Sequence, residues 1–415
     1  MINAATSPRR IIPNVGILIF AEIGAMSLWF VSNAILPELS AGTNLDPWRI
    51  GLLSAAVQIG FVVGALALAA FGIPDRFDPR RVFAIGAALA AISTAALVFT
   101  PPAGNIQIVL RFATGLCLAS VYPVGIQLAV SWTQKRRGLV VGLLVGALTL
   151  GSAMPHGLAL LGGANWQFTV LLASAIALSA AGLILTMKLG PYHTRAPAFS
   201  VRDLTLAWTL RPVRLAFAGY LAHMWELYAF WAWIAAALLV SFQEHGIANA
   251  PDMARLATFI AISIGGIFCI PTGALADRFG KAKIAGATMG LSASFGFCTA
   301  LSFNHSPELT VIFAVLWGVF IIPDSALFSA LVADAAPAGK SGSLMTLQTA
   351  LGFLITVLTI QMAPILAASF SWPAALAIFG VGPLVGIEAM RRLDGLLLQS
   401  NLRSRSTTLE EELPI

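Results

Sequence analysis

Twelve long apolar segments follow one another along this 415-residue chain, and they constrain its fold more than any other feature. Each is close to the length of about 20 residues that a helix needs to cross a bilayer. Within the hydrocarbon region every backbone polar group must be satisfied inside the protein, which favours helices. The segments cover roughly residues 12–37, 48–72, 82–100, 106–132, 138–162, 167–189, 213–241, 254–276, 282–303, 308–332, 342–367 and 372–392.

Composition and charge placement agree with an all-α integral membrane protein. Only 10% of the residues are charged, against about 25% in an average soluble protein. The net charge of +6 is explained by loop placement, because the N-terminus, the loops that follow even-numbered segments and the C-terminus hold all but three of the 24 Lys and Arg residues. Basic loops stay in the cytoplasm. We therefore expect a multi-pass protein of the plasma membrane, a bacterial inner membrane, with both termini cytoplasmic and with no nucleic-acid partner.

A polar stretch over residues 190–212 separates the first six segments from the last six. The predicted domains are an N-terminal six-helix bundle (1–189), a central cytoplasmic loop (190–212), a C-terminal six-helix bundle (213–392) and a cytoplasmic tail (393–415). We expect the chain to act as a monomer in the lipid bilayer.

The two halves also repeat one another. Related features recur 202 to 204 residues apart, which predicts two six-helix pseudo-repeats around a central cavity, as many transporters have. The pairs are Asp75-Arg76-Phe77 with Asp277-Arg278-Phe279, Glu22 and Trp29 with Glu226 and Trp233, and Gly115 with Gly318.

Several of these motifs resemble those of the major facilitator superfamily. The stretch from Gly273 to Lys281, GALADRFGK, is similar to the family's motif between helices 2 and 3 and between helices 8 and 9. The first-half copy, FGIPDRFDPRR, departs from it at a displaced Gly72 and at Asp78. Arg111-Phe-Ala-Thr-Gly115 resembles the fourth-helix arginine motif, and the glycines and proline over residues 142–157 resemble a fifth helix often associated with antiport. The resemblance implies a secondary transporter that works by alternating access.

The loop motif makes physical sense as a cytoplasmic gate. A carboxylate at a helix end can accept backbone N–H groups or pair with arginine, and glycine allows close approach. A turn that merely satisfies the positive-inside rule is the alternative. The gate residues expected are Gly72, Asp75, Arg76, Arg81, Gly273, Asp277, Arg278 and Gly280.

Four ionisable residues lie well inside predicted helices, namely Glu22, Arg111, Glu226 and Asp324. Each costs about 2.5–3.5 kcal/mol at a helix centre, so each needs a partner, water or a function. We expect them to bind substrate or protons. Helical phase adds cavity-lining residues on the two glutamate faces, and His156 stands beside Pro155. The expected lining is Met26, Trp29, Asn33, His156, His223, Phe230 and Trp233.

Proton coupling follows if a carboxyl group alternately meets an apolar cavity and water, because desolvation disfavours its charged form. Glu22 and Glu226 are the leading candidates, Asp324 is third, and Arg111 modulates them or forms a structural ion pair. The alternatives for the histidines and tryptophans are plain core packing and hydrogen bonding. No Walker loop, HExxH, CxxC or plausible Ser/His/Asp arrangement occurs, so we expect no ATP, cofactor, bound metal or enzyme activity.

Three transport hypotheses remain. The first is a proton-coupled transporter of a small amphipathic or cationic organic solute, with export by proton antiport favoured over import. The second is a proton-coupled importer of a small organic anion, which uses Arg111 as its clamp and a carboxylate to carry the symported proton. The third is a divalent-metal transporter that uses the buried acids and the two histidines. A transporter-like receptor without flux is disfavoured by the short loops.

Overall fold

The computed structural model describes residues 8–41, 43, 45–133, 137–163, 165–193, 200–337 and 339–411, and every regular element in these ranges is a helix. Two of them, η2 (Ala96–Phe99) and η3 (Val201–Thr205), are 3-10 helices. The α-helices are α1 (Pro8–Met26), α2 (Val31–Ala34), α3 (Leu36–Ala41), α4 (Pro47–Phe71), α5 (Ile73–Arg76), α6 (Pro79–Ala95), α7 (Asn105–Leu118), α8 (Tyr122–Val130), α9 (Arg137–Gly162), α10 (Trp166–Ile184), α11 (Leu206–Thr209), α12 (Arg211–Glu244), α13 (Ala250–Phe279), α14 (Lys281–Ser302), α15 (Pro307–Ile321), α16 (Ser325–Ala335), α17 (Ser341–Ser369) and α18 (Trp372–Glu411).

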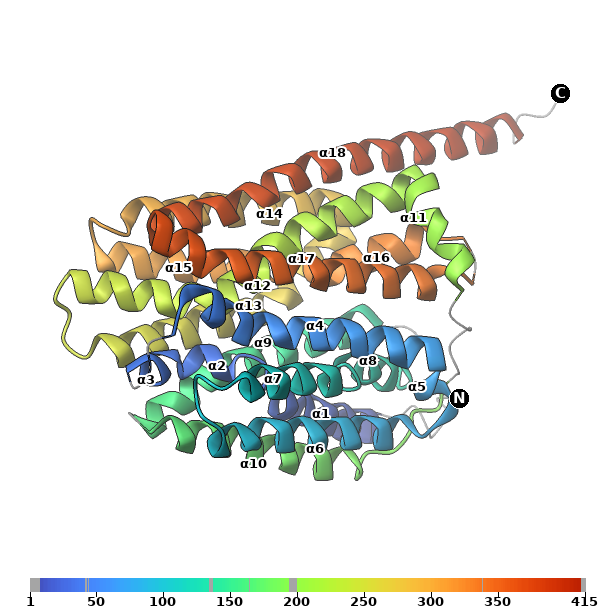
Figure 1. Cartoon of the computed structure of the whole chain (residues 1–415). Helices are drawn as coiled ribbons and strands as arrows, with labels where there is room; N and C mark the ends of the chain where they lie inside the picture. The colour runs from blue at the N-terminus through green and yellow to red at the C-terminus, as the bar shows by residue number, and fades with distance from the viewer. Residues whose placement is uncertain are drawn as a thin grey trace.

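The helices form two bundles that lie side by side (Figure 1). Helices α1 to α10 pack mainly with one another, and α12 to α18 do the same. Two seams join the bundles, one between α9 and α13 and the other between α4 and α17. The predicted fold class, an all-α membrane protein of two six-helix halves, is confirmed.

Three of the twelve predicted segments are interrupted. The first, expected to be continuous over 12–37, stops at Met26, makes a turn over residues 27–30 and resumes at Val31. The fourth breaks at residues 119–121 and the tenth at 322–324. Eleven spans in the described residues are long and apolar enough to cross a membrane, and the broken first segment contributes a shorter apolar helix, Ile11–Met26.

Helix ends follow local chemistry. The Asp46 side chain accepts a hydrogen bond from the Arg49 backbone N–H at 2.9 Å, and Pro47 fits the first turn of α4. Gly72 ends the same helix in the left-handed region at φ +59°, where a side chain would be strained. In the second half, α13 continues through Asp277 and ends at Phe279, with Gly280 as its C-cap. The two copies of the loop motif therefore have different backbones.

Close glycine contacts confirm the internal repeat. Gly115 of α7 lies directly against the backbone carbonyl of Val57 on α4. Gly318 of α15 lies in the same way against the carbonyl of Ala261 on α13. The glycines are 203 residues apart and their partners 204. A Cβ at either glycine would collide with the backbone, so the same helix contact is built twice from the same residue type.

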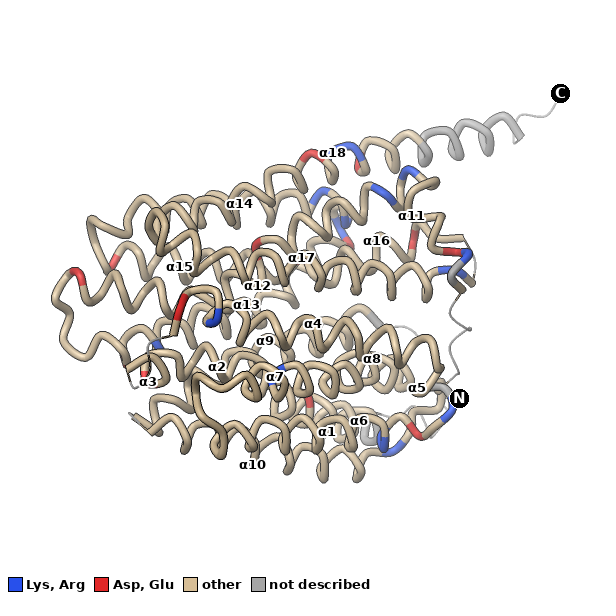
Figure 2. Tube along the Cα trace, viewed as in Figure 1, with Lys and Arg blue, Asp and Glu red and all other residues tan. Residues whose placement is uncertain are grey.

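Charged side chains concentrate at one end of the molecule, where α5, α11 and the N-terminus lie (right in Figure 2). We call this the basic end and the other the opposite end. Helix α18 continues to Glu411 at the basic end, so the boundary predicted at residue 393 falls inside this helix.

Candidate functional site

Glu22 is a buried carboxyl group without a hydrogen-bond partner among the described residues. It lies on α1, one turn before the helix stops, and its side chain is completely covered. Neither carboxyl oxygen accepts a hydrogen bond from a residue that the structure describes. Gly125 of α8 faces the group, and a Cβ on this glycine would lie 2.6 Å from Oε2. Gly125 therefore leaves room for the carboxyl group, and the described residues around it supply no donor that would stabilise a charge.

Glu226, its repeat counterpart on α12, has a different environment. Its Oε2 accepts a hydrogen bond from the Ser292 hydroxyl at 2.8 Å, and its Oε1 accepts one from the Trp317 indole N–H at 2.6 Å. In the 203-residue register set by Gly115 and Gly318, Thr114 takes the place of Trp317, and its hydroxyl donates to the Leu110 carbonyl at 2.9 Å. The second half therefore supplies two donors to its glutamate, whereas among the described residues the first half supplies none to Glu22.

Asp324 and His223 meet at the interruption of the tenth segment. Asp324 precedes α16, and its Oδ1 lies 3.0 Å from Nδ1 of His223 on α12. The other ring nitrogen of His223 lies 2.7 Å from the Ser325 hydroxyl. Both members of the pair are about 1% exposed. Two residues that the sequence suggested separately thus form one buried polar unit.

Arg111 binds backbone rather than a carboxylate. One terminal nitrogen donates to the Leu28 carbonyl at 3.0 Å and the other to the Trp29 carbonyl. The break in the first segment frees these carbonyls, and the guanidinium group satisfies them. Within the described part of the chain, no acid pairs with Arg111. Two backbone carbonyl dipoles take the place of the counter-ion that an ion pair would supply.

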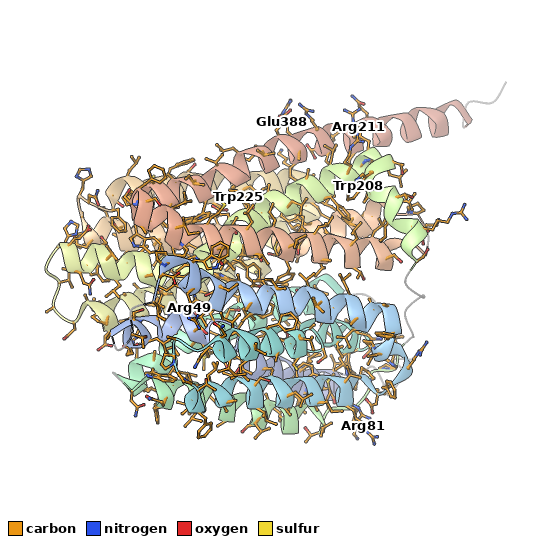
Figure 3. All side chains as sticks on the ribbon, viewed as in Figure 1. Arg49, Arg81, Trp208, Arg211, Trp225 and Glu388 are labelled. Atoms are coloured by element: carbon orange, nitrogen blue, oxygen red, sulfur yellow. The ribbon has the colours of Figure 1, made fainter. Side chains whose placement is uncertain are left out.

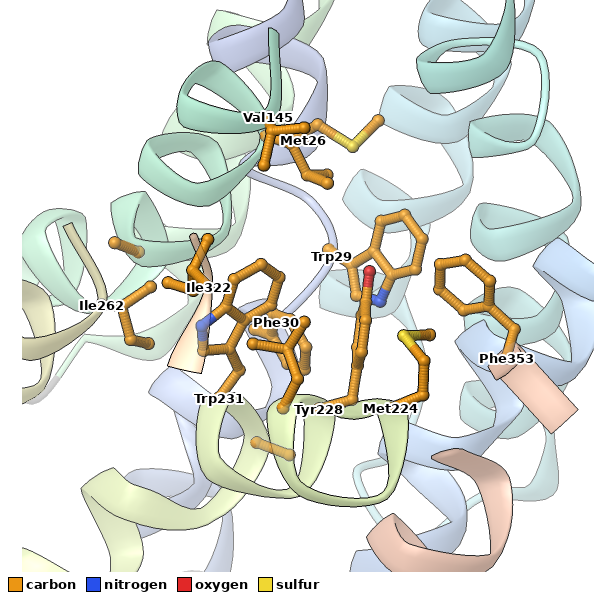
Figure 4. Close-up of a cluster of buried hydrophobic side chains, with 14 of the residues drawn as sticks. Met26, Trp29, Phe30, Val145, Met224, Tyr228, Trp231, Ile262, Ile322 and Phe353 are labelled. Carbon is orange, nitrogen blue, oxygen red and sulfur yellow. The ribbon is translucent and has the colours of Figure 1, made fainter. Parts of the chain in front are cut away.

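An aromatic cluster fills the centre between the halves (Figure 4). Trp29 lies 5.0 Å from Phe61 of its own half, measured between ring centroids, and 5.8 Å and 5.6 Å from Tyr228 and Phe353 of the other half. Trp231 joins the cluster 5.1 Å from Tyr228. The sequence argument found Trp29, but it missed Tyr228, Phe61 and Phe353, because their proximity depends on how three helices pack.

The other expected lining residues are distributed over separate contacts. Trp233 donates its indole N–H to the Ile360 carbonyl at 3.0 Å, and Phe230 packs 4.8 Å from Trp317. Met26 lies beside the central cluster (Figure 4). Asn33 donates to the Ala232 carbonyl of the other half at 2.8 Å.

A cavity of about 200 Å³ lies between the halves toward the opposite end, next to Asn33. Its polar lining comes from Asn33, Ser40, His156 and Arg255, while the rest is apolar. Arg255 also forms ion pairs with Glu38 of the first half and with Asp252. Sequence reasoning missed Arg255 as a site residue, although its place away from the basic loops was a usable signal, since arginine is uncommon there.

The expected gate residues lie at the basic end. Arg76, Arg81, Asp277, Arg278 and Gly280 are exposed, and the Arg278 guanidinium stacks 5.1 Å over the Phe279 ring. Gly72 and Gly273 are partly exposed, and the side chain of Asp75 lies outside the described residues. Among the described gate side chains, none forms a hydrogen bond or an ion pair with the other half.

Comparisons with known proteins agree with this architecture. The sequence model of the Major Facilitator Superfamily matches residues 18–248. An uncharacterized 38 kDa protein in the 23S RNA operon of Thermoproteus tenax is 28% identical over 250 residues, which are 59% of this chain and 62% of that protein. The chain thus spans less than two thirds of that relative.

Solved structures match over almost the whole chain. The xylose transporter XylE from E. coli, in a partially occluded inward-open conformation, is 13% identical with a TM-score of 0.72 over 92% of this chain and 98% of that one. A D-xylose-proton symporter is 17% identical, with a TM-score of 0.70 over 90% and 96%. The nucleoside transporter NupG is 16% identical, with a TM-score of 0.67 over 92% and 99%. Since the family model also matches more than half of the sequence, the chain belongs to the Major Facilitator Superfamily, a family of multi-pass membrane transporters and not of enzymes.

Proposed function

We propose that the chain is a proton-coupled secondary transporter that moves a small organic solute by alternating access, with export in exchange for protons as its direction. The observation that carries this proposal is the carboxyl group of Glu22, which is completely buried and has no partner among the described residues. An ionised carboxylate without donors is costly in an apolar environment. Glu22 therefore suits a protonated state here and an ionised state once water reaches it.

Glu226 takes a different role in this proposal. Its two donors, Ser292 and Trp317, stabilise a negative charge in place, so it suits a fixed anion better than a proton carrier. The two repeat-related glutamates then have different roles. Glu22 exchanges the proton, and Glu226 stabilises the packing of α12 against α14 and α15.

Contacts between the halves support alternating access. At the opposite end, Arg255 pairs with Glu38 across the halves, and the Gln361 side chain donates to the Trp48 carbonyl at 2.8 Å. At the basic end, Asp277 and Arg278 are exposed. We interpret this as a state that is closed at the opposite end. In this interpretation, the gate residues at the basic end form contacts between the halves when the halves rock and close that end.

The aromatic cluster around Trp29 and Tyr228 supports an amphipathic cargo, because aromatic faces bind apolar and cationic groups. The two alternatives receive less support. Both terminal nitrogens of Arg111 are occupied by carbonyls, which leaves no clamp for an anion in this state. For the described residues, no group of three His, Cys, Asp or Glu side chains is placed to hold a metal.

The test begins with a thermal-shift screen of metabolites and drugs, since a ligand that prefers the folded state raises the melting temperature. The best cargo is then followed in liposomes that contain the protein. We expect a pH gradient to drive accumulation in the wild type. Glu22→Gln should abolish this accumulation and keep exchange of labelled for unlabelled cargo. Glu308→Gln, which changes an exposed carboxylate, is the matched control. Wild-type flux that ignores the gradient, or normal coupling in Glu22→Gln, contradicts the proposal.

A further inference from the structure

We propose that the cavity at the opposite end is a binding site for a small organic anion with an apolar body, such as an aromatic monocarboxylate, and that this anion competes with Glu38 for Arg255. This inference goes beyond the proposed function, because it concerns a site that neither Glu22 nor the central aromatic cluster lines. It begins with two buried polar residues that face the cavity.

His156 is the first of these residues. It lies on α9, its side chain is fully buried, and neither ring nitrogen has a hydrogen-bond partner among the described residues. Buried polar atoms in proteins are nearly always paired. The imidazole of His156 lines the cavity, so a ligand bound there could form the hydrogen bond that the described residues do not.

Arg255 is the second residue, and it is the only charged one among the residues that line the cavity. Its side chain is 5% exposed, and its Nε has no partner in the described structure. One terminal nitrogen binds Glu38 of α3, and the other lies 3.1 Å from Asp252. Two carboxylates already balance this guanidinium, so a ligand carboxylate can bind it only by displacing one of them, and the planar guanidinium fork matches a carboxylate.

The size and the walls of the cavity define the rest of the ligand. The cavity measures about 200 Å³, and an apolar cavity of about 150 Å³ is known to hold benzene in another protein. Trp372, Leu239, Val240 and Pro37 supply apolar walls. An aromatic ring with one carboxylate would thus place the ring against these walls and direct its charge at Arg255 and His156.

Binding at this site has a consequence for the halves. Glu38 belongs to the first half and Arg255 to the second, so their ion pair holds the opposite end closed. A ligand carboxylate that takes over the guanidinium releases Glu38. The site would therefore couple occupancy by an anion to opening of this end.

The first experiment compares three probes of similar size, namely benzoate, benzylamine and benzyl alcohol, by titration calorimetry on the purified full chain at one fixed pH. We expect benzoate to bind at least about tenfold more tightly than the other two, since only benzoate presents an anion to the guanidinium of Arg255. Equal binding of all three, tighter binding of benzylamine, or no binding overturns the assignment.

Variants then separate competition from simple attraction. Arg255→Gln should abolish benzoate binding, whereas Glu38→Gln should strengthen it several-fold, because the internal competitor has gone. His156→Phe should weaken it. Arg49→Gln is the matched control, since Arg49 lies near the same end and does not line the cavity. Weaker binding in Glu38→Gln would contradict competition. The melting temperature of each variant shows that it is folded.

These titrations use no pH gradient and no flux. If benzoate binds as expected while transport is uncoupled from protons, the proposed function fails and the anion site stands. If benzoate does not bind while a pH gradient drives transport, the anion site fails and the proposed function stands.

Discussion

At the scale of single residues, two carboxylates in equivalent positions have opposite surroundings. Glu22 meets the backbone of Gly125 and no donor in the described structure, while Glu226 receives hydrogen bonds from a serine and a tryptophan. A buried charge with two donors is far less costly than one with none. The difference is chemical, since both side chains are equally buried.

The bond from Trp317 to Glu226 leads to a prediction about stability. Trp317→Phe removes the N–H donor together with part of the ring system, so we expect it to cost about 1.5–3 kcal/mol more than the same change where the indole binds no charged group. The measurement is thermal unfolding in detergent. Trp225→Phe is the control, because this indole donates to the neutral Ile378 carbonyl at 3.2 Å. A loss no larger than that of the control would show that the bond to Glu226 is not charge-assisted.

The sequence predicted which buried charges matter and little about their partners. Glu22, Arg111, Glu226 and Asp324 stood out because charge is rare inside apolar segments. Their partners come from other helices: Ser292 lies 66 residues from Glu226, and the carbonyl of Leu28 lies 83 residues from Arg111. Helical phase predicts which residues share one face of a helix. It does not predict which other helix packs against that face.

At the scale of elements, the sequence located the spans well and missed the break in the first one. Apolar length alone fixes where helices cross a membrane. Residues 27–30 contain neither proline nor glycine, so no local signal marks the turn there. Arg111 stabilises it from α7 by binding two of the freed carbonyls. The tenth segment, by contrast, breaks at Pro323, which has no backbone N–H to donate and therefore interrupts a helix.

The repeated glycine contact yields a prediction at this scale. Gly115→Ala and Gly318→Ala should each destabilise the fold by about 1–3 kcal/mol, because a methyl group must push two helices apart. Gly182→Ala is the control, since open space surrounds this glycine and alanine favours a helix. The measurement is thermal unfolding of the three purified variants. If the first two melt no lower than the control, the close approach of the helices is wrong.

At the scale of the whole molecule, the two ends differ in charge and in closure. The basic end carries most of the Lys and Arg residues, and the gate side chains there are exposed (Figure 2). At the opposite end, one ion pair and hydrogen bonds between described residues join the halves. A rocking motion that opens one end must break contacts such as the pair between Arg255 and Glu38.

The direction in which the molecule sits in the membrane is the last prediction. Since basic loops remain in the cytoplasm, the basic end should face inward. The test starts from a variant in which Cys117, Cys269 and Cys298 are changed to serine. A single cysteine is then introduced either at Arg81, at the basic end (Figure 3), or at the exposed Asn304, in a loop of the second half. An impermeant maleimide should label Asn304→Cys in intact cells and label Arg81→Cys only after permeabilisation. The reverse pattern would show that the protein is inserted the other way, and labelling of both positions in intact cells would show that these loops do not lie on opposite sides of the membrane.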